Sequence, residues 1–281
     1  MPSTRPFIPR ILLAFDFDQT LASDSIDAVL ELYGMARPDW DRDFVKPLGD
    51  GWDAIMRRSQ ALIELARARD KPLTRELMRE AAGRIRLYDG VLDMPEHLRE
   101  LARGVHPEIE LEFVVLSCGF SEIINGTEIG RLFDRSFASA FHFDGEGKAV
   151  CMKRIVGHPE KALYLEAMAK VLEVNDANAP EAAGRDIDEH EYHVPLDQMI
   201  YVGDGGSDLH AFGFMKASGG LAIAIDKDEV FDFADKQLPT QRVDNIARPD
   251  YSQGKELLHS LEHAVRACAS RIALRAEGQG E

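Results

Sequence analysis

Four short segments of the chain consist almost entirely of apolar residues and do not alternate with polar ones. Strands that helices cover on both faces of a parallel sheet show this pattern. We therefore expect buried parallel strands at residues 11–15, 111–116, 199–202 and 221–225. The first three runs end at turns rich in acidic, hydroxyl or glycine residues. Because ligands of open α/β sheets bind beyond the carboxyl ends of the strands, we expect the functional site at that edge.

Helical periodicity is found between and after these runs. A first helix is expected behind Ser23 or Asp24 as possible caps, because apolar residues recur there at helical spacing. These residues are Ile26, Val29, Leu30 and Tyr33. Pro159 is expected just inside another helix, where the missing N–H of proline is tolerated. A further helix is expected over residues 253–275. Together these elements predict an α/β fold with a Rossmann-like parallel sheet.

The interval between the first two strands is far longer than one crossover helix requires. It contains two amphipathic segments. The first places on one helical face the residues Trp52, Ile55, Met56, Leu62, Ile63 and Ala66. The second carries, after Thr74, the residues Leu77, Met78, Ala81 and Ile85. We expect residues 22–92 to form a mostly helical cap domain, inserted into an α/β core made of residues 1–21 and 93–281.

Residues 173–197 are polar, acidic and poor in periodicity, which predicts a surface loop. This segment contains a cluster of residue types that could be imagined as metal ligands. They are His190, His193, Asp186, Asp188 and Glu189. A solvated acidic loop is the favoured interpretation.

The composition, with 45% hydrophobic and 29% charged residues among 281, is that of an ordinary globular protein that can bury a full core. The formal net charge of −16 argues against nucleic acid or an anionic membrane surface as a partner. It also repels phosphate esters, so such a ligand would need a locally positive site. The three cysteines fit no disulfide framework or zinc site, and no apolar stretch approaches the ~18 residues of a membrane span. A cytoplasmic protein is therefore expected.

Asp16 and Asp18 follow the first strand in the sequence DFDQT. Two carboxylates at a strand end can face one pocket, and their proximity is unfavourable unless they share a cation. Mg²⁺ suits such a site because it takes oxygen ligands, including those of a substrate phosphate. One carboxylate can then attack phosphorus while the other exchanges a proton with the leaving oxygen or the incoming water. Alone, this pair is a weak signal.

The sequence GDGGSD after the third strand adds Asp204 and Asp208. Glycines allow the backbone to turn tightly and to approach a ligand closely. Asp-Gly turns are common in loops, and Asp208 could simply cap the next helix. Four carboxylates at two strand ends nevertheless favour a metal site.

The second strand leads into Ser117, Cys118 and Gly119, at an expected strand-to-helix turn. The Ser117 hydroxyl and neighbouring backbone N–H groups could donate to phosphate oxygens there. Cys118 is interpreted as a bystander thiol, because no base is near it in sequence. The cation that faces the phosphate is expected to be Lys161, one turn into the helix that begins near Pro159, with Lys153 as the alternative.

In this chain order the motifs resemble those of the haloacid dehalogenase-like (HAD) hydrolase superfamily, which consists largely of phosphatases. DFDQT fits its DxDxT motif, Ser117 its hydroxyl motif, Lys161 its lysine motif and GDGGSD its acidic motif, over about residues 8–226. The resemblance implies a Rossmann-like core with an inserted cap. It also implies Mg²⁺-dependent hydrolysis of a small phosphomonoester through an aspartyl-phosphate.

The resemblance further implies roles for individual residues. Asp16 would be the nucleophile and a metal ligand, and Asp18 would be the general acid/base that also ligates the metal through its carbonyl. Asp204 would ligate Mg²⁺, and Asp208 would ligate it or orient its water. The phosphate-binding residues would be Thr20 (which supports the turn), Ser117, Cys118, Gly119 and Lys161. The dehalogenases of the superfamily lack an acid at the position of Asp18, so its presence favours phosphoryl transfer.

The chain most resembles the phosphoserine-phosphatase-like subgroup, which has a helical cap between its first two motifs and an SGGF-like second motif, here SCGF. The stretch Met56-Arg57-Arg58 resembles the cap segment whose arginine holds the substrate carboxylate in that subgroup, which makes Arg57 a candidate for that role. The glutamate that receives the substrate ammonium falls on Ser25, so this sequence departs from the phosphoserine pattern.

The expected partner is therefore a small phosphorylated metabolite. The same site would serve a phosphotransferase or mutase that passes phosphate to a sugar or alcohol. A non-catalytic protein that binds a phosphorylated metabolite is the remaining alternative. The presence of both Asp16 and Asp18 counts against it, because binding alone does not need the two together.

Overall fold

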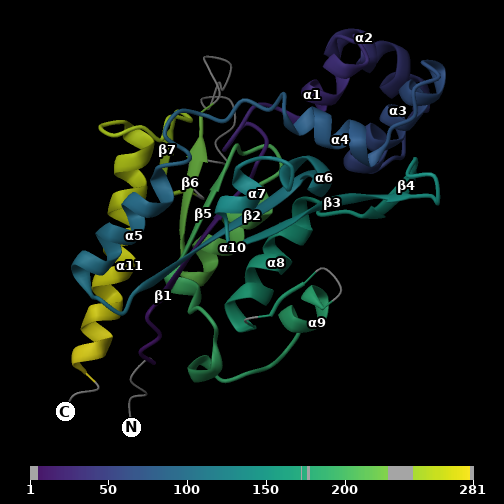
Figure 1. Cartoon of the computed structure of the whole chain (residues 1–281). Helices are drawn as coiled ribbons and strands as arrows, with labels where there is room; N and C mark the ends of the chain where they lie inside the picture. Colours follow the sequence, from purple (N-terminus) through teal and green to yellow (C-terminus); the bar gives the residue numbers. More distant parts are fainter. Residues whose placement is uncertain (1–5, 172, 176–177, 227–242, 279–281) are drawn as a thin grey trace.

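The computed structural model describes residues 6–171, 173–175, 178–226 and 243–278. Its centre is a seven-stranded sheet of order β4-β3-β2-β1-β5-β6-β7 (Figure 1). All neighbouring strands are parallel except β3 and β4. The strands are β1 (Arg10–Phe15), β2 (Glu110–Phe120), β3 (Arg135–Phe143), β4 (Ala149–Arg154), β5 (Met199–Gly203), β6 (Leu221–Ile225) and β7 (Asn245–Ala247). The expected α/β fold with a Rossmann-like parallel sheet is confirmed.

Helices surround this sheet on both faces and beyond one edge. They are α1 (Ser25–Leu32), α2 (Arg37–Trp40), α3 (Ala54–Ala68), α4 (Arg75–Ala82), α5 (Met94–Val105), α6 (Ser121–Ile124), α7 (Ile129–Leu132), α8 (His158–Lys170), α9 (Ala179–Ala183), α10 (Leu209–Ser218) and α11 (Glu256–Glu277). A π-helical turn covers Asp41–Val45, and 3-10 turns cover Lys46–Leu48, Glu189–Glu191 and Leu196–Gln198. Within the described ranges, none of these helices reaches both the length and the hydropathy of a bilayer-spanning segment.

The four expected strands are present as β1, β2, β5 and β6. Strand β2 is longer than expected and continues to Phe120, with a shift of its register against β3 between Ser117 and Phe120. Ser117 therefore lies inside the strand and not in a turn after it. Strands β3, β4 and β7 were not expected from the sequence.

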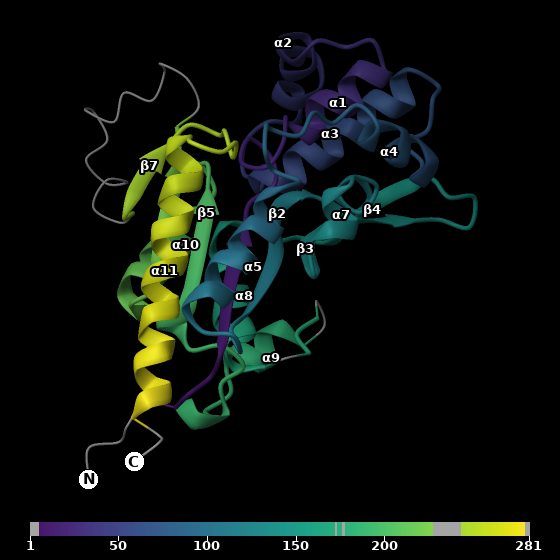
Figure 2. The same ribbon diagram turned by 60° about the vertical axis from the view of Figure 1, so that its left-hand side comes forward.

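Strand β1 is buried on both faces, as its continuous apolar sequence indicates. Ile11, Leu13 and Phe15 belong to the hydrophobic cluster that includes α5 and α11. Leu12 and Ala14 belong to a second cluster with α8, α9 and α10. Figure 2 shows α5 and α11 on one side of the sheet and α8 and α10 on the other.

Helices α1 to α4 lie beyond the carboxyl ends of the central strands (Figure 1) and are called the helical layer below. Each of the three longer helices has a side-chain cap: the N–H groups of the first turns donate to Asp24 in α1, Asp53 in α3 and Thr74 in α4. Their apolar faces form a third cluster, which also contains Phe120 and Phe141 from β2 and β3. The cap boundaries at residues 22–92 stay a prediction.

The expected apolar face of α3 is only partly correct. Ile55, Leu62 and Ile63 are buried. Trp52 precedes the helix, and Trp52 and Met56 are each 42% exposed. Helical spacing identified the helix, but the packing of its neighbours decided which of its apolar residues are covered.

The expectation of a surface loop at residues 173–197 is wrong for much of the described part of that segment; residues 176 and 177 lie outside it. The segment contains α9, and Val174 and Val194 are buried in the cluster beside α8. His193 is buried as well. Its Nδ1 accepts a hydrogen bond from Arg10 (2.8 Å), and its Nε2 donates to Glu112 (2.9 Å). Through these hydrogen bonds, His193 attaches the segment to β1 and β2.

Glu112 is the centre of this contact, because it also forms an ion pair with Arg135. Burial raises the pKa of the Glu112 carboxyl, but the hydrogen bond from His193 and the charge of Arg135 outweigh burial and lower it below its usual value. Folding therefore stabilises the ionised form of the Glu112 carboxyl.

We predict that Glu112→Gln lowers the free energy of unfolding by about 2 kcal/mol, because it removes a charged hydrogen-bond acceptor from two partly buried donors. Glu110→Gln, on the same strand, is the matched control. Glu110 is 72% exposed where it pairs with Arg10, so its replacement costs less than about 1 kcal/mol. Urea unfolding at neutral pH measures both.

The pH dependence has a definite sign. A carboxyl whose pKa is lowered on folding stabilises the protein above its unfolded pKa, and this stabilisation is lost as the pH falls through the folded pKa. The difference in the free energy of unfolding between wild type and Glu112→Gln therefore becomes smaller below about pH 4. If Glu112→Gln and Glu110→Gln lowered the free energy of unfolding equally at neutral pH, this would contradict the role given to Glu112.

Candidate active site

A cavity of about 440 Å³ lies between the carboxyl ends of β1, β2 and β5 and the helices α1 and α3. The strand-end motifs of the sequence meet in its wall: Asp16 and Asp18 after β1, Ser117 to Gly119 in β2, and Asp204 after β5. The expectation that these motifs share one edge of the sheet is confirmed.

Asp16 is buried at the end of β1. Its N–H donates to the carbonyl of Val202 (2.8 Å), which ties the end of β1 to β5. Its Oδ1 accepts from the N–H of Phe17 (2.7 Å), and its Oδ2 lies 3.0 Å from Nζ of Lys161. Burial raises the pKa of Asp16 although Lys161 opposes the rise. Additional positive charge in the cavity would favour the ionised, nucleophilic form.

Lys161 is completely buried in the first turn of α8. Its Nζ lies 2.5 Å from Asp208 and 3.2 Å from the hydroxyl of Ser207, besides Asp16. Burial disfavours its charged form, but the two carboxylates outweigh burial and raise the pKa of Lys161 well above its usual value. Lys153 is exposed on β4 and does not line the cavity. Of the two candidate lysines, the fold therefore brings Lys161 to the motif aspartates.

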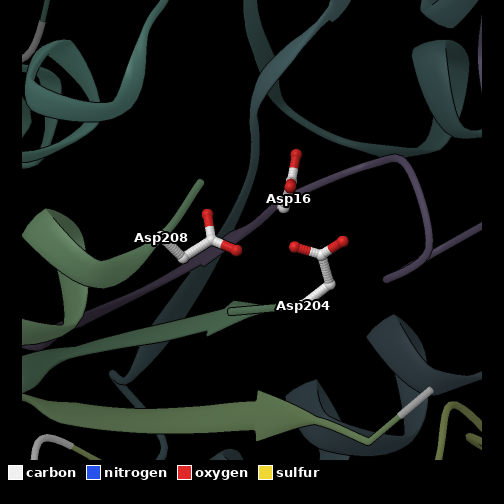
Figure 3. Close-up of side chains that lie close together, drawn as sticks. All are labelled: Asp16, Asp204 and Asp208. Atoms are coloured by element: carbon white, nitrogen blue, oxygen red, sulfur yellow. The ribbon is translucent and has the colours of Figure 1, made fainter. Parts of the chain in front are cut away.

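Three carboxylates converge at this point (Figure 3). Asp16, Asp204 and Asp208 each offer an oxygen, and these oxygens lie within 4.8 Å of one another. Asp208 is fully buried, and it accepts hydrogen bonds from the Tyr201 hydroxyl (2.6 Å) and the N–H of Gly205 (3.1 Å). Burial raises the pKa of Asp208, but Lys161 outweighs this effect and lowers it.

This donor set fits a hard divalent cation such as Mg²⁺. Carboxylate oxygens are its preferred protein ligands, and one buried ammonium group does not balance three carboxylates. Asp204 is partly exposed to the cavity, so a cation could be bound on that side.

The Asp18 side chain is outside this carboxylate cluster. Its Oδ1 and Oδ2 accept hydrogen bonds from the N–H (2.7 Å) and the hydroxyl (2.9 Å) of Ser25 at the start of α1. Burial, followed by the charges of Asp24 and Asp16, raises the pKa of Asp18 well above its usual value. A protonated Asp18 can donate a proton to a group in the cavity.

Ser117, Cys118 and Gly119 form the wall opposite β5. The Ser117 hydroxyl accepts from the N–H of Gly119 (3.1 Å). A Cβ at position 119 would lie 2.7 Å from Oδ2 of Asp18, so a side chain there would displace the Asp18 carboxyl. Burial raises the pKa of the Cys118 thiol to about 12, which keeps it protonated and agrees with a thiol that is no nucleophile.

Four of the expected site residues are not part of the cavity lining: Thr20, Arg57, Lys161 and Asp208. Lys161 and Asp208 are fully buried, and Lys161 contacts the lining residue Asp16. Thr20 is buried beside the cavity, and its carbonyl accepts a hydrogen bond from the Tyr251 hydroxyl (2.9 Å). Its hydroxyl has no hydrogen-bond partner among the described residues. Thr20 thus belongs to the support of the DFDQT turn and not to the cavity wall.

The expectation for Arg57 is corrected by the structure. Its Nε donates to the carbonyl of Val45 (3.1 Å) within the helical layer, and its side chain does not line the cavity. The next residue, Arg58, does line it. Ser25 is at the cavity as expected, but as a hydrogen-bond donor to Asp18.

Further residues that the sequence motifs did not assign to the site also line the cavity. His158 lies three residues before Lys161, a helical spacing that could have pointed to it. Asp24 also lines the cavity, although its carboxylate caps α1 and pairs with Arg37 (2.5 Å). Tyr201 looked like an ordinary apolar strand residue, and only its hydroxyl contact with Asp208 reveals a different role.

Comparisons with solved structures agree with this fold. A substrate-bound phosphoserine phosphatase has 21% sequence identity and a TM-score of 0.57, over 90% of this chain and 98% of that chain. A HAD family hydrolase from Salmonella enterica serovar Typhi has 16% identity and a TM-score of 0.56, over 89% and 70% of the two chains. A cytosolic 5′-nucleotidase IIIB bound to cytidine has 14% identity and a TM-score of 0.51, over 94% and 88%. No curated protein matches the chain.

The family model described as haloacid dehalogenase-like hydrolase matches residues 13–213. The match spans the DFDQT turn, the Ser117 segment, Lys161 and the GDGGSD turn, which are the elements that the fold brings together. This chain belongs to the haloacid dehalogenase-like hydrolase family.

Proposed function

We propose that this protein is a Mg²⁺-dependent phosphatase that hydrolyses a small phosphomonoester through a phosphorylated Asp16. The observation that carries the proposal is the contact of Asp16 with the buried Lys161, inside a cluster of three carboxylates at the cavity. The likeness in fold to a phosphoserine phosphatase and a 5′-nucleotidase supports it.

In this mechanism a carboxylate oxygen of Asp16 attacks phosphorus, and the bond from phosphorus to the ester oxygen breaks. Lys161 and the Ser117 hydroxyl hold the phosphoryl oxygens in the orientation that the attack requires. Bound Mg²⁺, held by Asp16, Asp204, Asp208 and the carbonyl of Asp18, would neutralise charge on the phosphoryl group.

Asp18 serves as the general acid and then as the general base. Its raised pKa favours the protonated form, which gives its proton to the leaving oxygen. The resulting carboxylate then takes a proton from the water that attacks the phosphorylated Asp16. Ser25 keeps the carboxyl of Asp18 oriented through two hydrogen bonds.

Residues 22–92 act as a cap in this proposal. Helices α1 and α3 contribute to the wall of the cavity, so the layer shields the reacting groups from bulk water. A cavity of about 440 Å³ fits a small ester, not a phosphoprotein.

The wall of the cavity made by α1 and α3 suits an ester with a second acidic group. Arg58 supplies a positive charge there, and Ile26 and Ile55 supply apolar surface. Asp24 is already paired with Arg37, so it is not available to a substrate ammonium group. We therefore place acidic esters without an amino group ahead of phosphoserine as substrates.

We predict that Asp16→Asn lowers kcat by about 10³-fold or more, because it removes the nucleophile. Asp18→Asn lowers kcat by about 10²- to 10⁴-fold and leaves Asp16 in place. Phosphate release from a panel of small esters with Mg²⁺, and with EDTA as control, measures both. Full activity of Asp16→Asn, or in EDTA, would refute the mechanism. Phosphate transfer to an added alcohol in place of release would favour the phosphotransferase alternative.

Arg58→Gln is expected to raise KM about tenfold for esters that carry a carboxylate, because it removes a charged partner. Its effect on phenyl phosphate is small, since that ester has no second charge. Arg57→Gln is the matched control and leaves both KM values within about twofold, because Arg57 lies outside the cavity. If Arg57→Gln raised KM for the carboxylate esters more than Arg58→Gln does, Arg57 would be the substrate-binding arginine, as expected from the sequence.

Tyr201→Phe is expected to weaken Mg²⁺ binding about tenfold, because the Tyr201 hydroxyl orients the Asp208 carboxylate. Isothermal titration of the metal gives the Kd directly. Tyr33→Phe removes a hydroxyl that donates to Lys71 (3.0 Å) in the helical layer, and it leaves the Kd unchanged. Equal metal affinity in the two variants would assign Tyr201 to stability alone.

A further inference from the structure

A second hollow, separate from the active-site cavity, lies between α4, α6 and α7. Its volume is about 500 Å³, and its walls are polar. It is lined by Arg75 and Arg79 of α4, by Arg131 of α7, and by Ser121, Glu122 and Asn125 of α6 and its end. No residue lines both this arginine groove and the active-site cavity.

The arginine groove carries positive charge on a protein whose formal net charge is −16. Arg131 has no carboxylate partner among the described residues. The Nη1 of Arg79 lies 3.7 Å from Glu76, a distance beyond hydrogen bonding, and both side chains are largely exposed. Glu122 is the single acidic residue in the lining, so three guanidinium groups face one carboxyl.

Glu122 carries at most one negative charge against the three arginines of the lining. It is partly buried, and burial raises the pKa of its carboxyl despite the charges of Arg75 and Arg154.

The groove is also held in shape. The Arg75 guanidinium lies over the ring of Phe143, 4.3 Å from its centre, which fixes the side chain before any ligand arrives. Helix α4 approaches α6 closely, since a Cβ at position 126 would lie 2.7 Å from the Cβ of Ala82. Figure 1 shows α4 next to α6, where the helical layer meets the sheet.

We propose that the arginine groove binds a small organic or inorganic polyanion with at least two negative groups, of the polycarboxylate or polyphosphate class. Guanidinium groups on α4 and α7 match such a ligand, because each forms paired hydrogen bonds to carboxylate or phosphate oxygens. Ser121 and Asn125 supply further polar contacts. A ligand held by α4 on one side and by α6 and α7 on the other fastens the helical layer to the core.

The test uses citrate as a probe of the polycarboxylate class and tripolyphosphate as a probe of the polyphosphate class. Isothermal titration is performed on protein freed of metal with a chelating resin, because soluble chelators are themselves polyanions. Without metal, the active-site carboxylates repel both probes. Wild type is expected to bind at least one probe with a Kd below about 1 mM at physiological salt.

The double variant Arg79→Gln/Arg131→Gln is expected to weaken this binding at least about tenfold. It leaves Arg75 on Phe143 and changes only exposed side chains, so the fold is preserved; circular dichroism verifies this. The matched control Arg42→Gln/Arg67→Gln removes the same charge from exposed positions outside the groove. It is expected to change the Kd less than about twofold.

The stronger probe identifies the polycarboxylate or the polyphosphate class, and either one supports the proposal. Absence of binding to wild type overturns it. Equal weakening in the two double variants also overturns it, because the attraction would then be that of net charge. Weakening by Arg58→Gln with none by the groove variant would place the anion in the active-site cavity and would likewise overturn it.

Discussion

The active site depends on one buried positive charge. A lysine with no exposure to solvent is stable only where carboxylates and hydrogen-bond acceptors surround it. The Nζ of Lys161 lies 3.0 Å from Asp16 and 2.5 Å from Asp208. These residues come from α8, the end of β1 and the start of α10, so one ammonium group holds together elements that are far apart in sequence. Asp16 keeps its place in the wall of the cavity while it makes this contact.

The order of the strands creates the place for this contact. The chain continues from β1 to β2 and β3 on one side, and later adds β5, β6 and β7 on the other. The crevice between the carboxyl ends of β1 and β5 is a topological switch point, where open α/β sheets bind their ligands. Burial of β1 on both faces holds this edge of the sheet in place, and the hydrogen bond from Asp16 N–H to the Val202 carbonyl positions Asp16 against β5.

Recognition of an anion by so acidic a protein has to occur at short range, since the overall field repels it. In the two proposals made above, the cations that serve this purpose are Lys161 beside Asp16, Arg58 in the cavity wall, and the three arginines of the groove between α4, α6 and α7. Asp24 shows the complementary case. It lines the cavity, and besides burial its charge raises the pKa of Asp18, while its carboxylate binds Arg37 and the first turn of α1.

The sequence by itself determined the class of fold and the aspartates of the candidate site. Strands buried on both faces read as apolar runs, and each motif follows such a run, so their meeting at one edge could be inferred. Strand β3 could not be predicted in this way because it mixes small and polar residues with aromatic ones. Strand β7 could not be predicted because it has only three residues. The choice between Arg57 and Arg58 belongs to the tertiary structure. Neighbouring residues on a helix point about 100° apart, and only the packing of α3 against the layer turns Arg58 toward the cavity.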